Sequence, residues 1–211
     1  MGIEETRRDY GRAELRKRDL DPDPLTQFAS WMADAVAADL LEPTAMTLAT
    51  ADASGRVSAR MVLLKGYGPQ GLLFYSNYAS RKAQDLAANP QAALVLYWDR
   101  LERQIRVEGT VDKLSREVSE AYFRSRPRGS QVGAWASPQS SPLRDREELL
   151  AREEAARKRF DGREVPLPDH WGGYRLQPLA LELWQGRPER LHDRFRYTRH
   201  GDSWSLERLA P

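Results

Sequence analysis

The 211-residue sequence contains no cysteine. This absence excludes disulfide scaffolds, zinc ribbons, iron–sulfur clusters and thiol nucleophiles, and it fits a reducing compartment. No apolar run approaches the ~18 residues of a membrane-spanning helix, and the charged N-terminal stretch lacks the apolar middle of a signal peptide. We therefore expect a cytoplasmic protein with no membrane partner, which takes any redox chemistry from an organic cofactor.

The sequence also lacks a strong excess of either charge, because its 33 Lys and Arg residues nearly balance its 31 Asp and Glu residues and leave a net charge of +2. Binding to nucleic acid depends on many phosphate contacts, so this balance argues against a nucleic-acid partner. The chain has neither a GxGxxG motif after a strand nor a Walker P-loop. A bound phosphate must therefore be held by side chains, and we expect no metal site.

The chain divides into an N-terminal arm, residues 1–20, and one domain, residues 21–211. The arm is rich in charge and poor in large apolar side chains, so we expect it to be flexible unless it docks. Asp23 before Pro24 predicts a helix start. Apolar residues then recur at helical spacing and predict a helix face that packs on a core: Leu25, Phe28, Trp31, Met32, Ala35 and Val36.

From Thr44 onwards, short β-rich runs separated by turn signals predict a meander of strands. The pattern favours an α+β fold with mostly antiparallel strands in a barrel or a strongly curved sheet. Helices are expected at about 80–89, 115–125 and 144–160, with a long loop from 126 to 142. The expected strand sequences are TAMTLATA, RVSARMVLLK, GLLFYS, AALVLYW, RQIRVEGTVDKL, LALELWQG, RFRYTR and SWSLERL.

Two pairs of cations flank the early strands. Arg60 and Lys65 bracket the apolar run MVLL, and their odd spacing sends them to opposite faces of a regular strand unless a bulge intervenes. Arg81 and Lys82 lie in the first turn of a predicted helix, where cations oppose the helix dipole. A bound phosphate would resolve this conflict, whereas without one these residues are solvated basic side chains.

Two further clusters combine cations with other polar groups. Tyr122 and Arg126 share a helix face, and Ser130 follows the turn at Pro127; these are donors that suit a second phosphate, or a helix end with favourable arginines. Arg190, His192 and Arg194 alternate along an expected strand, so all three point one way. A face with three cationic or potentially cationic groups is hard to stabilise without a ligand. Because His192 has such neighbours, we expect it to be a functional residue.

Polar and aromatic residues elsewhere would suit a flat heterocycle. They carry little weight individually, since each also fits an ordinary sheet, loop or core position. They are Gln104, Gln139, Ser140 and Trp184.

The order of these motifs resembles the pyridoxamine 5′-phosphate oxidase family nearly end to end. The motifs that carry the resemblance are RRDY, RDLDPDPLTQF, PTAM, RMVLLK, FYSN, SRKAQDL, LERQ, YFRSRPRGSQVGAW, SPQSS, VPLPDHWGGYR, LELWQGRPERLHDRF and ERLAP. The resemblance implies an FMN-binding split β-barrel with peripheral helices, working as a homodimer with each flavin between subunits. Ser76 stands where the family often has threonine, and the hydroxyl is retained.

The resemblance also implies roles for particular residues. Catalysis falls on Arg190 and His192. The flavin-binding positions are Arg60, Met61, Val62, Leu63, Leu64, Lys65, Tyr75, Ser76, Arg81, Lys82, Gln104, Gln139, Ser140, Trp184 and Arg194. The substrate-binding positions are Lys65, Tyr122, Arg126, Ser130, Arg190 and His192, with Arg7, Arg8 and Tyr10 of the arm closing over the pocket.

The implied activity is oxidation of pyridoxamine or pyridoxine 5′-phosphate to pyridoxal 5′-phosphate, with dioxygen as electron acceptor and hydrogen peroxide as product. Two alternatives stay open. Another flavin reductase on the same barrel would keep the Arg60, Arg81 and Lys82 side but has no reason to keep the substrate positions together. A non-catalytic flavin carrier or RNA-binding module would use the arginines alone, and RNA binding would be strongly salt-dependent.

Overall fold

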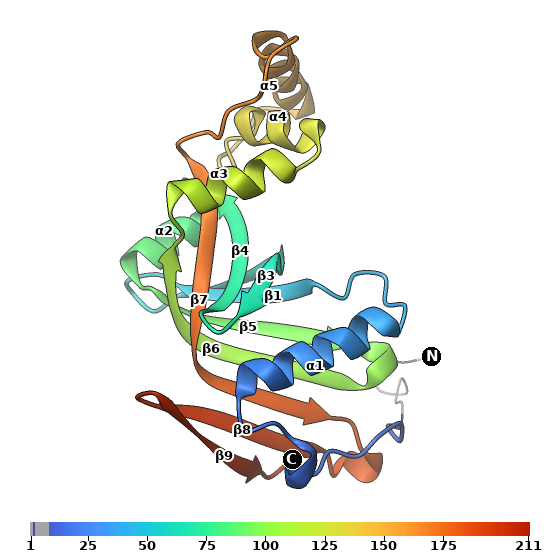
Figure 1. Cartoon of the computed structure of the whole chain (residues 1–211). Helices are drawn as coiled ribbons and strands as arrows, with labels where there is room; N and C mark the ends of the chain where they lie inside the picture. Colours follow the sequence, from blue (N-terminus) through green and yellow to red (C-terminus); the bar gives the residue numbers. More distant parts are fainter. Residues whose placement is uncertain (1, 3–8) are drawn as a thin grey trace.

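The computed structural model describes residue 2 and residues 9–211. In this part of the chain nine strands form one antiparallel sheet, in which the order β2-β1-β5-β6-β7-β4-β3 is extended by β8 on β7 and by β9 on β8 (Figure 1). The strands are β1 (Ala45–Ala51), β2 (Val57–Leu63), β3 (Gly66–Gly68), β4 (Gly71–Asn77), β5 (Gln91–Trp98), β6 (Arg103–Lys113), β7 (Trp171–Gln185), β8 (Asp193–His200) and β9 (Ser203–Leu209). Five α-helices and three short 3₁₀ turns accompany them: α1 (Pro24–Ala37), α2 (Arg81–Ala88), α3 (Arg116–Ser125), α4 (Arg128–Ala136), α5 (Arg146–Arg159), η2 (Lys17–Asp19), η3 (Asp99–Leu101) and η4 (Pro188–Arg190).

The sheet curls around the hydrophobic core, which confirms the predicted α+β split-barrel class. Strand β7 makes this curl possible because its first half pairs with β4, its second half pairs with β8, and β6 follows it along most of its length. Figure 1 shows β7 running from the end that carries α3 to the end that carries β8. One strand therefore connects the two ends of the molecule.

The first half of β7 was not predicted from the sequence. It contains Gly172, Gly173 and Pro178, residue types that are disfavoured in strands. The register between β6 and β7 shifts by one residue at Gly109, which pairs with Pro178. Proline lacks a main-chain N–H and is tolerated at such irregularities. At Gly109 the strands approach so closely that a Cβ atom would collide with the main-chain oxygen of Gln177.

Helix α1 begins as predicted. The Asp23 carboxylate accepts a hydrogen bond of 2.7 Å from the Thr26 N–H, and Pro24 occupies the first helical position. The apolar face of α1 joins the main core, in which Phe28 and Trp31 are buried together with strand residues such as Leu48. Full burial of side chains of this size contributes roughly 1.5–3 kcal/mol each. The prediction that Val36 belongs to the apolar face of α1 is wrong, because its side chain is exposed near the end of the helix.

The predicted long loop at 126–142 is wrong, because residues 128–136 form α4. Its helical pattern was hidden by Pro127 and two glycines, but Val132 and Ala136 bury one face of the helix. They pack in a second cluster with Phe160 at the end of α5. Tertiary packing of an apolar face, which the local sequence does not show, stabilises this short helix.

Residues 10–20 of the predicted arm lie against the body of the protein. Leu15 and Leu20 are buried in the main core cluster, and the Tyr197 hydroxyl donates a hydrogen bond of 2.6 Å to the carbonyl oxygen of Asp21. Arg7 and Arg8 lie outside the described residues. The domain boundary between residues 20 and 21 stays a prediction.

Within residue 2 and residues 9–211, we find no helix that is both long enough and apolar enough to cross a membrane.

We predict that Gly109→Ala lowers the free energy of unfolding by about 2 kcal/mol, because the added methyl group must displace main-chain atoms of β7. Gly133→Ala in α4 is the matched control, since its Cβ would meet no neighbouring atom and alanine favours a helix by roughly 0.5–1 kcal/mol. Urea unfolding of both variants measures the difference. A Gly109→Ala variant as stable as the wild type would contradict this account of the bulge.

Candidate functional site

A cavity of about 630 Å³ lies where β2 and β4 meet α2, α3 and α4. We call it the cationic cavity. Its walls combine four basic side chains with hydroxyls, an amide and aromatic rings. The lining residues are Arg60, Met61, Val62, Leu63, Lys65, Tyr75, Ser76, Lys82, Tyr122, Arg126, Pro127, Ser130, Gln139 and Trp171.

A change of strand partner brings Lys65 to the same cavity as Arg60. Strand β2 ends at Leu63, where the Leu64 N–H still bonds to the Thr44 carbonyl beside β1. The next residue, Lys65, donates its N–H to the carbonyl oxygen of Leu73 in β4. The face alternation of a regular strand therefore stops at Leu63, and Arg60 and Lys65 both line the cavity despite their odd spacing.

Lys82 is a buried cation surrounded by neutral groups. Its ammonium donates to Gln139 Oε1 at 2.9 Å, Ser76 Oγ at 3.1 Å and Ser80 Oγ at 3.2 Å. No carboxylate of the described residues forms an ion pair with it. Burial, reinforced by the positive charge of Arg60, lowers the pKa of Lys82. An anion in the cavity would stabilise the charged form of Lys82.

Arg126 has an unused donor in the same cavity. Its guanidinium lies 4.5 Å from the centre of the Trp171 ring, a cation–π contact. Among the described residues, its buried Nη1 atom has no hydrogen-bond partner. Burial lowers the pKa of Arg126. An unpaired buried donor is costly, so this atom also indicates an anionic ligand.

Arg60 is held by a polar network that the sequence analysis did not identify. Its Nη1 donates to Thr50 Oγ1 at 2.8 Å, and its Nη2 donates to Ser58 Oγ. Both hydroxyls donate to the buried Asp85 carboxylate, at 2.7 and 3.0 Å, and Asp85 lies 3.7 Å from Arg60 Nη2. Burial lowers the pKa of Arg60, whereas the charge of Asp85 opposes this effect. Asp85 therefore orients Arg60.

Aromatic rings form another wall of the cavity. Tyr75 and Tyr122 stack with ring centres 3.8 Å apart, and Trp171 lies parallel to both. Burial raises the pKa of Tyr75 and of Tyr122. Both hydroxyls therefore stay protonated at neutral pH and can donate hydrogen bonds.

The remaining predicted positions are divided among other places. Leu64 is buried in the core beside the cationic cavity. Arg81 lines a neighbouring surface hollow that it shares with Asp85, and Ser140 follows Gln139 in a left-handed conformation with a φ of 71°. Neither Arg81 nor Ser140 lines the cationic cavity.

A second group of predicted residues lies across β6, β7 and β8. Gln104 is opposite Trp184 in the sheet, and Trp184 is opposite Arg194. The His192 ring lies 4.5 Å from the Trp184 ring, and Tyr10 of the arm packs edge-on against both, at 5.6 and 5.7 Å. We call Tyr10, Gln104, Trp184, His192 and Arg194 the aromatic–histidine cluster.

The prediction that Arg190, His192 and Arg194 alternate along one strand is wrong. Strand β8 begins at Asp193, and residues 188–190 form the turn η4. Glu189 and Arg190 have positive φ values of 54° and 64°, so the chain reverses there. The sequence PERL contains no glycine, so it gave no sign of this left-handed turn.

The cationic cavity and the aromatic–histidine cluster lie near opposite ends of β7. Trp171 lines the cationic cavity and starts the strand, whereas Trp184 of the aromatic–histidine cluster lies thirteen residues further along it. Thirteen residues span about 40 Å of extended strand, reduced somewhat by curvature. A single small ligand therefore cannot contact both groups within one chain.

Comparisons with known proteins show which family has this sequence. A family model described as pyridoxamine 5′-phosphate oxidase matches residues 32–159, and a model described as the pyridoxine 5′-phosphate oxidase C-terminal dimerisation region matches residues 171–211. The chain belongs to the pyridoxamine 5′-phosphate oxidase family. The predicted family and the predicted oxidase class are thereby confirmed.

Curated relatives of this oxidase family match almost the whole chain. Proteins named pyridoxine/pyridoxamine 5′-phosphate oxidase from Rubrobacter xylanophilus and Ralstonia pickettii are each 55% identical, and the matches cover 97% and 99% of this chain and 94% and 99% of the relatives. The solved structure of PhzG from Burkholderia lata 383, in complex with tetrahydrophenazine-1-carboxylic acid, is 32% identical with a TM-score of 0.89. It covers 95% of this chain and 100% of PhzG.

An FMN-binding protein from Nostoc punctiforme, related to pyridoxamine 5′-phosphate oxidase, shares the fold with a TM-score of 0.71 at 18% identity. It covers 91% of this chain and 100% of the Nostoc chain. Membership of the oxidase family supports flavin binding by the present chain. The individual roles of the predicted site residues stay predictions. The geometry brings twelve of the predicted flavin and substrate positions to the cavity that Trp171 also lines: Arg60, Met61, Val62, Leu63, Lys65, Tyr75, Ser76, Lys82, Tyr122, Arg126, Ser130 and Gln139.

We predict that Asp85→Ala lowers the free energy of unfolding of the ligand-free protein by about 1–3 kcal/mol, because Arg60 and two hydroxyls lose a buried acceptor. Glu153→Ala is the control, since this residue pairs with Arg157 on the exposed face of α5, where an ion pair contributes at most about 1 kcal/mol. Urea unfolding compares the two. Equal losses would show that Asp85 does not orient Arg60.

Proposed function

We propose that this chain is an FMN-dependent oxidase that converts pyridoxamine and pyridoxine 5′-phosphate to pyridoxal 5′-phosphate. The observation that carries the proposal is the cationic cavity, in which Lys82 and Arg126 lack a negatively charged partner among the described residues. Both the proposed cofactor and the proposed substrate carry a phosphate group. The names of the curated relatives support the same substrates.

The residues of the cavity fit two separate anions. We assign the FMN phosphate to Arg60, Ser76 and Lys82, with Arg81 close to the same helix start. We assign the substrate phosphate to Lys65, Tyr122, Arg126 and Ser130. Binding energy from a phosphate remote from the reacting carbon serves to align that carbon.

Bound FMN would supply the redox chemistry, which is acceptance of a hydride equivalent from the substrate's 4′ carbon and reoxidation by dioxygen to hydrogen peroxide. The task of the protein is to hold the substrate ring in place and to exclude competing reactions. Arg190 and His192 would orient the ring and its oxygen, with Trp184 forming a wall. The cytoplasmic location expected from the sequence stays a prediction.

A second copy of the chain would complete each site, as the resemblance to the family implies. The aromatic–histidine cluster belongs to the region matched by the dimerisation model, apart from Tyr10 and Gln104. It lies too far along β7 to reach the cavity of its own chain. In a symmetric dimer each chain supplies a cavity to one site and a cluster to the other.

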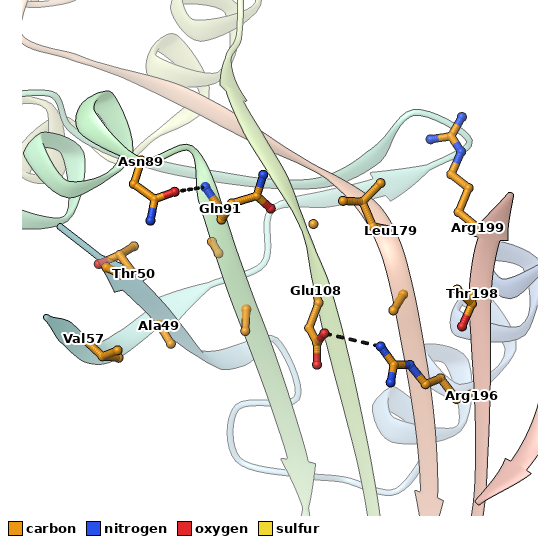
Figure 2. Close-up of a pocket in the computed structure, with 15 residues that line it drawn as sticks. Ala49, Thr50, Val57, Asn89, Gln91, Glu108, Leu179, Arg196, Thr198 and Arg199 are labelled. Atoms are coloured by element: carbon orange, nitrogen blue, oxygen red, sulfur yellow. Dashed lines mark hydrogen bonds and ion pairs between the residues drawn. The ribbon is translucent and has the colours of Figure 1, made fainter. Parts of the chain in front are cut away.

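The outer face of the sheet offers a surface for this second copy. A groove of about 710 Å³ crosses β1, β5, β6, β7 and β8, and Figure 2 shows the residues that line it. Its lining includes the small residues Ala49 and Ala93 and the exposed Leu179. Arg196 lies 3.6 Å from Glu108 within it. The groove continues into residues 171–211, which supports a homodimer.

We predict that Arg126→Ala weakens binding of pyridoxamine 5′-phosphate by about 1.5–3 kcal/mol, as for a lost charged hydrogen bond. Occupancy by FMN should stay normal. Steady-state kinetics and a flavin titration measure the two effects. The exposed Arg124, which pairs with Glu120 on α3, provides the control Arg124→Ala. A Michaelis constant unchanged in Arg126→Ala would refute the assignment, and turnover of tetrahydrophenazine-1-carboxylic acid alone would refute the proposed substrate.

We also predict that two variants with low activity at low substrate concentration restore activity when they share a dimer. Arg126→Ala damages the cavity and Arg190→Ala damages the other half-site, so a mixed dimer keeps one intact site. Equal co-expression should yield about a quarter of wild-type activity, since half of the dimers are mixed. Co-expression of Arg126→Ala with Tyr122→Ala is the control and should restore nothing. No recovery with the first pair would contradict the shared site.

A further inference from the structure

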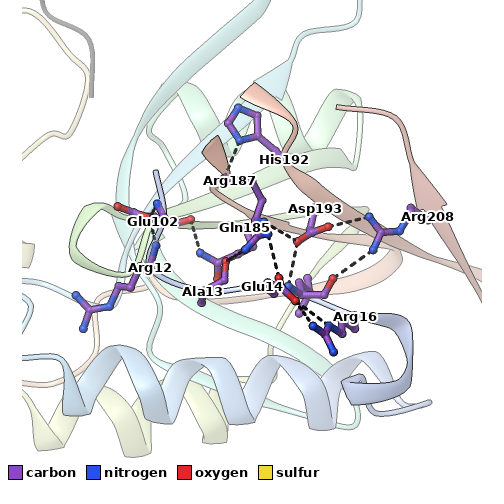
Figure 3. Close-up of polar contacts among 12 residues, drawn as sticks. Arg12, Ala13, Glu14, Arg16, Glu102, Gln185, Arg187, His192, Asp193 and Arg208 are labelled. Atoms are coloured by element: carbon purple, nitrogen blue, oxygen red, sulfur yellow. Dashed lines mark hydrogen bonds and ion pairs between the residues drawn. The ribbon is translucent and has the colours of Figure 1, made fainter. Parts of the chain in front are cut away.

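Arg187 connects the docked arm with His192. It follows Gly186 at the end of β7, and Figure 3 shows its side chain among residues 12–16 while its main chain faces the His192 ring. None of the assigned cofactor or substrate positions includes Arg187. Its contacts fall into two sets, one made by the main chain and one by the guanidinium.

The main chain of Arg187 fixes the proton position on His192. The Arg187 N–H donates a hydrogen bond of 3.1 Å to His192 Nδ1. A main-chain nitrogen can only donate, so Nδ1 accepts and carries no proton. The neutral ring therefore has its proton on Nε2. Burial, together with the charge of Arg190, lowers the pKa of His192 and favours this neutral form.

The guanidinium of Arg187 holds the arm. Nη1 donates to the Ala13 carbonyl oxygen at 3.1 Å, and Nη2 donates to Glu14 Oε1 at 3.1 Å. Nε lies 3.6 Å from Asp193, the residue next to His192. The carboxylate of Asp193 also accepts the Leu15 N–H at 3.1 Å. Arg187 and Asp193 thus bind residues 13–15 to the short segment that carries His192.

The arm in turn packs on the His192 ring. Glu102 accepts the N–H groups of Gly11 and Arg12, at 2.9 and 3.0 Å, and this places Tyr10 against His192. Gly186 leaves the room that Tyr10 needs, because a Cβ there would overlap the Tyr10 side chain. Docking of the arm and the position of His192 therefore depend on the same short segment, residues 186–193.

We propose that Arg187 is a positioning residue: its main chain holds His192 as the neutral Nε2–H tautomer, and its guanidinium fastens residues 10–15 over that ring. The inference rests on the proposed function only in giving His192 a substrate to contact. His192 then offers a hydrogen-bond donor, Nε2–H, to an oxygen of the substrate. Nδ1 is not available as a base while Arg187 donates to it.

The tautomer is measured directly on the flavin-loaded protein. Nitrogen-15 NMR of histidine-labelled protein at neutral pH separates the protonated from the unprotonated ring nitrogen. The chain has three histidines, and the variants His170→Gln and His200→Gln assign the signals. We expect His192 to be neutral with the proton on Nε2. A proton on Nδ1, or a doubly protonated ring, would overturn the first half of the proposal.

The fastening of the arm is measured with Arg187→Ala, Arg187→Lys and the control Arg157→Ala, which breaks only an exposed pair on α5. Hydrogen exchange should become roughly tenfold faster at the Leu15 N–H in Arg187→Ala, and lysine should restore part of the protection. The Michaelis constant should rise roughly 3- to 10-fold with the turnover number changed less than about twofold.

Wild-type exchange at Leu15 in Arg187→Ala would overturn the second half of the proposal, as would a loss in turnover number with an unchanged Michaelis constant. A wild-type protein without oxidase activity would refute the proposed function alone. The NMR and exchange measurements would still decide the role of Arg187, because they report on His192 and the arm without turnover.

Discussion

The burial of positive charge without matching negative charge is the constraint on which the cavity depends. Lys82 is surrounded by hydroxyls and an amide, and Arg126 keeps a buried donor without a partner among the described residues. Of the four cations that line the cavity, only Arg60 has a carboxylate partner within residues 9–211, namely Asp85, which also accepts hydrogen bonds from two hydroxyls. Such an arrangement lowers the stability of the ligand-free protein, and binding of a phosphate, as we propose, would offset this cost.

Strand β7 separates the cationic cavity from the aromatic–histidine cluster. It starts at Trp171 beside the cations and ends near Trp184 beside His192, so one chain carries two halves that cannot meet. The bulge opposite Gly109 and the close strand approach there let this long strand serve both ends of the curled sheet. The same length that separates the halves is the reason why we propose a site shared between two copies.

Short β-rich runs and the turn residues between them predicted most strands, and the Asp23–Pro24 pair predicted the start of α1. Helix α4 was missed because Val132 and Ala136 are stabilised by contacts with distant residues. Arg190 was misplaced because nothing in its local sequence marks a left-handed turn. The cations of the site were identified from charge clusters, whereas Asp85 was not, since a lone acid on a helix gives no sign of a partner on a strand.

Binding of FMN and of riboflavin to the ligand-free protein, measured by calorimetry, tests the central claim most directly. The two molecules differ only in the phosphate. If the buried cations require that anion, two or more charged hydrogen bonds should make FMN bind at least about 100-fold more tightly. Equal affinities would contradict the account, because the cations would then serve no phosphate.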